Sequence, residues 1–179
     1  TEYRVIERLQ RGKAPVIVPL AFPAAPPIER AEVALDTSLA QLQHWEQAPA
    51  NAARLVAAGV PIALTTRGLK EPGKAFWPNL RRAVAAGLDA DDALRALTVT
   101  PADLAGQGAR LGRIAVGRSA NLVVADADLF RAENASIFSV WVDGVRHELK
   151  PLPGVDPRGT WRMAWADGKG PATLEISGD

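Results

Sequence analysis

The stretch Val60-Pro-Ile-Ala-Leu-Thr65 decides the fold, because it is a short apolar run between segments of helical periodicity. Such a run, without alternating polar residues, is typical of a parallel-sheet strand that is buried on both faces. The run Pro15-Val-Ile-Val-Pro-Leu20 has the same character, and helical patterns over 2–12, 29–47 and 49–58 surround the two runs. We therefore predict two neighbouring parallel strands in an α/β arrangement.

Further helices are predicted after the second strand, over residues 76–86 and from Asp89 to about residue 97. Asp89 is a favourable N-cap, and Asp91 and Asp92 fall in the first helical turn, where the helix dipole favours acidic side chains. We therefore interpret these three acids as capping residues and not as a cation site.

The pattern changes after Gly106, where short β runs alternate with glycine turns. We predict strands over 114–116, 121–125 and 139–142. Asp143-Gly144 is a hairpin signal, since this dipeptide favours the tight turns that join antiparallel strands. The second half of the chain is therefore predicted to be mainly antiparallel β, and the stretch from residue 161 to 176 is expected to add two more strands.

Composition excludes several classes of function. Apolar residues make up 47% and charged residues 23% of the 179 residues, and the net charge is +1, so neither nucleic acid nor a membrane surface is an expected partner. The longest apolar stretches are interrupted by proline, which argues against a membrane span. The absence of cysteine excludes disulfides and thiolate metal sites. The sequence does not separate a cytoplasmic from an exported protein.

Four segments in the second half of the chain carry a family resemblance. They read Ala93-Leu-Arg-Ala-Leu-Thr-Val-Thr-Pro-Ala102, Leu111-Gly-Arg-Ile-Ala-Val-Gly117, Ala120-Asn-Leu-Val-Val-Ala-Asp126 and Val140-Trp-Val-Asp-Gly144. In order and spacing they resemble the C-terminal signature of the amidohydrolase superfamily, most closely its imidazolonepropionase-like branch. Residues 49–88 resemble the last helix–strand–helix unit of the family's barrel, whereas residues 21–47 and 151–179 show no alignable similarity.

This resemblance implies α/β plus β architecture: a partial (β/α)8, TIM-type barrel with a small composite β-sandwich. Residues 1–106 would form the C-terminal part of the barrel, 107–150 a sandwich segment, and 151–179 further strands or a tail. A closed barrel takes about 250 residues, and two strands cannot close one. We therefore expect a fragment or a piece of a longer protein. Its expected partner is the missing N-terminal half of the barrel, and homo-oligomer formation stays open.

The resemblance also implies metal-dependent hydrolysis of carbon–nitrogen bonds. Family members bind one or two divalent ions through a His-x-His pair, two further histidines, often a Lys or Glu, and an Asp after the last strand. Imidazoles bind Zn²⁺ well, and the metal lowers the pKa of its water to about 7. Here His44 and His147 are the only histidines, and neither falls at the end of a predicted barrel strand. We expect no metal ligand in this chain, although an active family member would carry zinc.

Arg67 stands where the resemblance places the catalytic aspartate, in the run Ala63-Leu-Thr-Thr-Arg-Gly68. A carboxylate accepts the proton of metal-bound water, whereas a guanidinium stays protonated and repels the metal. A different register would instead make Glu71 or another acid the relevant residue. The pattern indicates no substrate-binding residue.

Asp126 and Asp128 resemble a paired-carboxylate site, but the resemblance makes this acidic stretch the turn that ends a sandwich strand. Two hypotheses for function remain. The first is a hydrolase of amides, cyclic amides or peptide-like substrates to which this chain contributes its last barrel strands. The second is a catalytically degenerate structural domain of a larger protein, as Arg67 suggests.

Overall fold

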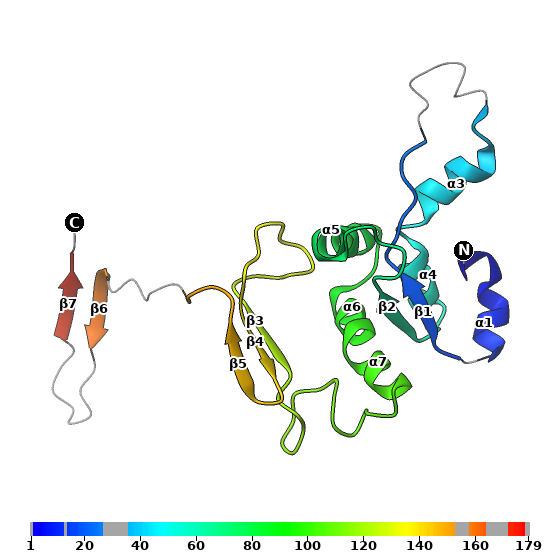
Figure 1. Cartoon of the computed structure of the whole chain (residues 1–179). Coiled ribbons are helices and arrows are strands. Elements are labelled where there is room, and N and C mark those ends of the chain that lie inside the picture. The colour runs from blue at the N-terminus through cyan, green and yellow to red at the C-terminus, as the bar shows by residue number, and fades with distance from the viewer. Residues whose placement is uncertain (1, 13, 27–35, 153–157, 164–171, 178–179) are drawn as a thin grey trace. The chain divides into compact units, whose positions relative to one another are not determined.

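The structure is a computed structural model that describes residues 2–12, 14–26, 36–152, 158–163 and 172–177 (Figure 1). The chain divides into two units, Thr1–Leu149 and Lys150–Asp179. Among the described residues, no helix has both the length and the apolar character needed to cross a membrane.

Two parallel strands form the centre of the first unit. Strand β1 covers Val16–Pro19 and strand β2 covers Ile62–Thr65, and the pairing runs in register from Val16↔Ile62 to Pro19↔Thr65. This confirms the two predicted strands and their parallel arrangement. Within the described ranges this sheet has two strands and does not close into a barrel.

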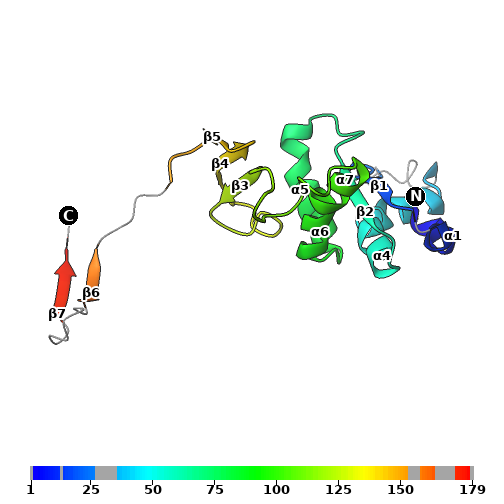
Figure 2. The same ribbon diagram turned by 90° about the horizontal axis from the view of Figure 1, so that it is seen from below.

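Helices precede and follow the two strands in the chain (Figures 1 and 2). They are the 3-10 turn η1 Glu2–Val5 and the α-helices α1 Ile6–Gly12, α3 Leu39–Gln47, α4 Asn51–Ala57, α5 Pro72–Ala85, α6 Ala90–Leu97 and α7 Val99–Leu104. Helix α3 begins with a capping box in which Ser38 and Gln41 exchange hydrogen bonds. Helix α5 begins one turn earlier than expected, because Pro72 is favourable in a first helical turn. The part of the predicted 29–47 helix over 29–35 lies outside the described residues.

The core lies between the strand pair and the helices α4, α5 and α6. Its fully buried large side chains are Val18, Leu20, Leu55, Leu80 and Leu88. The helices α5 and α6 contribute buried alanines at the same core, and small side chains allow close approach of neighbouring elements. The apolar residues that indicated strand and helix thus meet in one cluster.

A three-stranded antiparallel sheet follows the helical part of the chain. Its order is β3 (Leu122–Ala125), β4 (Ile137–Val142), β5 (Val145–Glu148). The turn between β4 and β5 has φ of 47° at Asp143 and 84° at Gly144, which fits the hairpin predicted there. The prediction of antiparallel β structure in this part of the chain is confirmed.

The strand predicted over 114–116 is wrong. Ile114 and Val116 are fully or almost fully exposed, and the segment is irregular. The glycines on either side, Gly112 and Gly117, have φ of 83° and 82°, so the backbone turns at both ends of the short run. A short apolar run forms a strand only where a second strand is available to pair with it.

Gly112 packs closely against the junction between α6 and α7, where a larger side chain would not fit. A Cβ at this position would lie 2.8 Å from the Thr98 carbonyl oxygen and 3.0 Å from the Ala102 Cβ, at a positive φ. We expect Gly112→Ala to lower the free energy of unfolding by about 1–3 kcal/mol. Urea unfolding followed by circular dichroism measures this loss. Gly117→Ala is the matched control, since it has a similar φ but no atom within 4 Å, and equal losses in the two variants would contradict the packing argument.

The second unit contains a two-stranded antiparallel hairpin. Strand β6 covers Gly159–Met163 and strand β7 covers Ala172–Ile176, paired from Gly159↔Ile176 to Met163↔Ala172. Two strands are therefore present in the last stretch, as the sequence pattern indicates. The segment between the two strands, residues 164–171, lies outside the described residues.

Candidate functional site

The carboxyl ends of β1 and β2 lie at one edge of the parallel pair, where an α/β fold places its ligand site. The backbone N–H of Leu20 donates to the Thr65 carbonyl at 3.0 Å, which extends the pairing to this edge. Asn79 on α5 donates its Nδ2 to the Leu20 carbonyl at 2.8 Å. Strand pairing and a hydrogen bond from the following helix therefore both hold the backbone at this edge.

Arg67 lies in a tight turn directly after β2. The Leu69 N–H donates to the Thr66 carbonyl at 3.0 Å, and Gly68, the third residue of this turn, has φ of 85°. This geometry is typical of a type II turn, which needs glycine at its third position. The Arg67 N–H donates to Thr65 Oγ1 at 3.2 Å. The turn thus presents the exposed Arg67 side chain directly after β2, and its correspondence to the catalytic aspartate of the resemblance stays a prediction.

The chemistry of this turn is that of a fixed cation and not of a base. A guanidinium stays protonated at physiological pH and cannot accept a proton from water. The alternative acid, Glu71, lies just before α5 and forms an exposed ion pair with Lys74 at 2.7 Å. Glu71 follows Arg67 by four positions. The alternative register, in which Glu71 is the catalytic acid, therefore stays a prediction.

The described residues do not fit a metal centre. His44 is half-buried in α3 and His147 is exposed in β5. Across the described part of the chain, no group of three or more His, Asp or Glu side chains could hold an ion. Metal-assisted catalysis would therefore need metal ligands from outside the described residues.

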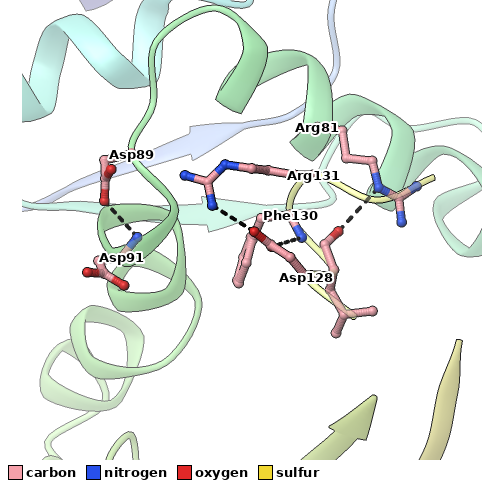
Figure 3. A network of polar contacts seen from close by, with 7 residues as sticks. Arg81, Asp89, Asp91, Asp128, Phe130 and Arg131 are labelled. Atoms are coloured by element: carbon pink, nitrogen blue, oxygen red, sulfur yellow. Dashed lines mark hydrogen bonds and ion pairs between the residues drawn. The ribbon is translucent and has the colours of Figure 1, made fainter. Parts of the chain in front are cut away.

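Asp126 and Asp128 serve the turn that follows β3 and do not converge on a common site. Asp126 Oδ1 accepts from the Ser136 N–H at 2.7 Å. Asp128 accepts from the Phe130 N–H at 2.9 Å and from Arg131 Nη1 at 2.6 Å (Figure 3). Each carboxylate is thus used to hold the loop between β3 and β4, which agrees with the structural interpretation.

Asp89 caps α6 as predicted. Its side chain accepts from the Asp91 N–H at 2.9 Å, near the Asp128 network (Figure 3). This hydrogen bond satisfies a backbone donor that the first helical turn leaves free.

The Asp128–Arg131 contact predicts a pH dependence. Hydrogen bonds from Arg131 and then from the Phe130 N–H hold the pKa of the Asp128 carboxyl below its ordinary value. Because the folded-state pKa is depressed, the stabilisation is present above the unfolded-state pKa and is lost as pH falls through the folded-state pKa. We expect Arg131→Gln to raise the pKa of Asp128, as measured by carboxyl ¹³C NMR titration. An unchanged midpoint would show that the Arg131 contact does not form in solution.

A concave feature lies between α5 and the loop from residue 128 to 133. This hollow has a volume of about 800 Å³, and its lining includes Pro78, Arg81, Arg82, Phe130, Arg131 and Glu133. Sequence analysis did not single out these residues, because two short segments far apart in the chain contribute them and neither contains a recognisable motif.

A family model described as "Amidohydrolase family" matches residues 46–149. The match covers more than half of the chain, including β2, the Arg67 turn and the three-stranded sheet. The chain belongs to the amidohydrolase family.

Relatives and solved structures agree with this assignment. The N-substituted formamide deformylase of Arthrobacter pascens is 32% identical over 104 residues, which cover 49% of this chain and 19% of that protein. An amidohydrolase from Thermotoga maritima MSB8 has a TM-score of 0.60 at 26% identity, covering 81% of this chain and 34% of that one. A structure of molinate hydrolase, at 20% identity, shares the fold with a TM-score of 0.53 over 87% of this chain and 38% of that one. The chain therefore spans well under half the length of these proteins.

Proposed function

We propose that this chain supplies the C-terminal half of a (β/α)8 amidohydrolase barrel of the imidazolonepropionase-like branch, together with a segment of its composite β-sandwich. The observation that carries the proposal is the family match over residues 46–149, which begins before β2 and ends at the last residue of the first unit. The parallel β1–β2 pair supports it, since such a pair is the repeating element of a barrel.

The proposed reaction is hydrolysis of a carbon–nitrogen bond in an amide, cyclic amide or peptide-like substrate by the longer polypeptide. The 32% identity to a protein named as an N-substituted formamide deformylase supports this reaction class. The described residues contain no candidate metal centre. The divalent metal, expected to be zinc, would therefore need ligands from the N-terminal half of the barrel, and we propose that the isolated chain is inactive.

A second candidate function is a catalytically degenerate domain, and a specific observation favours it. Arg67 occupies the exposed turn after β2, where the resemblance places the proton-accepting aspartate. Across the described residues no acceptor contacts its guanidinium. A fixed positive charge at this position opposes a dication. In this case the barrel would serve as a structural module.

The test compares the isolated chain with a longer polypeptide that adds a strand carrying His-x-His. Both are incubated with zinc and assayed by liquid chromatography against an N-substituted formamide, a cyclic amide and a dipeptide. Hydrolysis by the longer protein alone supports the enzyme. Hydrolysis by neither, with both folded by circular dichroism, supports the degenerate domain. Hydrolysis by the isolated chain would contradict both proposals.

A further inference from the structure

The hollow between α5 and the loop from 128 to 133 carries an excess of positive charge. Three arginines line it, Arg81, Arg82 and Arg131, and the acidic residue of the lining is Glu133. Each guanidinium is a planar fork with several N–H donors, which suits paired hydrogen bonds to a carboxylate. The hollow is therefore complementary in charge to an anionic ligand.

Two of these arginines are held by uncharged partners. Arg81 donates its Nε to the Leu129 carbonyl at 3.2 Å, and the Arg82 guanidinium lies over the Phe22 ring at 5.2 Å from its centre. A carbonyl and a ring orient a guanidinium without cancelling its charge. Arg131 differs, because it forms an ion pair with the Asp128 carboxylate. Across the described residues Arg81 and Arg82 form no ion pair, so they supply the positive charge of the hollow, which Glu133 offsets in part.

The shape of the hollow favours an extended ligand over a small anion. Figure 3 shows the Arg81 and Arg131 side chains on either side of the turn that contains Asp128 and Phe130, so they do not converge on one point. A volume of about 800 Å³ lies near the upper end of the range for small-molecule sites. Pro78 and the half-buried Phe130 add apolar surface between the charges. This arrangement suits a peptide in which acidic and apolar side chains alternate along the sequence.

We propose that this hollow is a docking site for an acidic segment of a partner protein. Carboxylates of the segment bind Arg81 and Arg82, and an apolar side chain of the segment contacts Phe130. Because both arginines are already oriented by the fold, binding loses less side-chain freedom than it would with mobile arginines. The lining of the hollow does not include Arg67, and its proposed role does not depend on the proposed hydrolytic function.

The experiment measures fluorescence anisotropy of a labelled synthetic peptide in which glutamate alternates with leucine and alanine. The matched peptide has glutamine at every glutamate position. We expect saturable binding of the glutamate peptide to the 179-residue chain, with affinity that falls as salt rises. We expect Arg82→Glu to weaken binding by about tenfold or more, since it replaces a charge-assisted contact by repulsion.

Arg113→Glu is the control, because Arg113 is exposed, is not part of the hollow and undergoes the same change of charge. Arg81→Gln gives an independent second variant, and circular dichroism verifies the fold of each. Equal binding of the glutamine peptide would overturn the proposal. Equal weakening by Arg113→Glu would do so too, because net charge alone would then explain binding. Absence of binding by the glutamate peptide would overturn the proposal. Its displacement by free glutamate or phosphate at constant ionic strength would show a small-anion site and would also overturn it.

Discussion

Arg67→Asp should raise the zinc content of a longer amidohydrolase polypeptide that contains this chain and a His-x-His strand, from near zero toward stoichiometric binding. The same substitution in the isolated chain should leave zinc content unchanged. The carboxylate would then occupy the turn after β2, at the edge where the parallel strands end. The measurement is metal content by mass spectrometry of protein dialysed against zinc.

The expected size of the effect follows from Coulomb's law. A charge of +1 at about 4 Å from a charge of +2 costs about 8 kcal/mol at an effective dielectric constant of about 20. Arg67 is exposed, so solvent and reorientation of the side chain reduce this figure and make it an upper bound. Even a fraction of that cost separates an empty from a filled site, since each 1.4 kcal/mol is about tenfold in affinity.

Arg67→Gln is the control for removal of charge alone, and it should recover part of the zinc content. Glu71→Gln tests the alternative register, in which Glu71 and not position 67 provides the carboxylate. Stoichiometric zinc on the unmodified chain, which needs ligands that its described residues do not bring together, would contradict the placement of the site.

Leu80→Ala should cost about 2–5 kcal/mol of the free energy of unfolding. Leu80 on α5 is fully buried and belongs to the cluster that joins α5 to β1, α4 and α6. Its truncation removes apolar contacts and leaves a cavity in a core that is already small. Domains of this size have total stabilities of about 5–15 kcal/mol, so the variant would lose a large share of its stability.

Urea unfolding followed by circular dichroism measures this loss. Leu94→Ala is the matched control, because Leu94 is 48% exposed on α6 and its truncation should cost far less. Leu80→Met preserves most of the side-chain volume and should cost less than about 1.5 kcal/mol. Similar losses for Leu80→Ala and Leu94→Ala would mean that the α5 core is not formed as described.

Much of the fold could be predicted because its signals are local. The two aliphatic runs, the Asp89 cap and the Asp143-Gly144 turn each specify their own conformation, and the structure confirms all three. The strand expected over 114–116 failed because pairing depends on a partner elsewhere in the chain. A similar short apolar run does form a strand over 121–125, where β4 is available to pair with β3.

The candidate site, too, could be predicted from the sequence only in part. The position of Arg67 after β2 follows from the strand pattern, since a turn must come where the apolar run ends. The arginine hollow could not be predicted, because the orientation of Arg81 depends on a carbonyl of Leu129 that only the tertiary fold brings near. Its role in docking and the role of Arg67 in metal exclusion stay predictions.

The long connection between β1 and β2 has a consequence for folding during synthesis. Val16 pairs with Ile62, so β1 leaves the ribosome well before its partner strand exists. Its aliphatic residues are exposed in that interval, and unpaired strands of this kind attract other chains. Pro15 precedes the strand and Pro19 is its last residue, and both lack the N–H group that pairing with a foreign strand would use. These prolines should therefore delay aggregation of the nascent chain until β2 arrives.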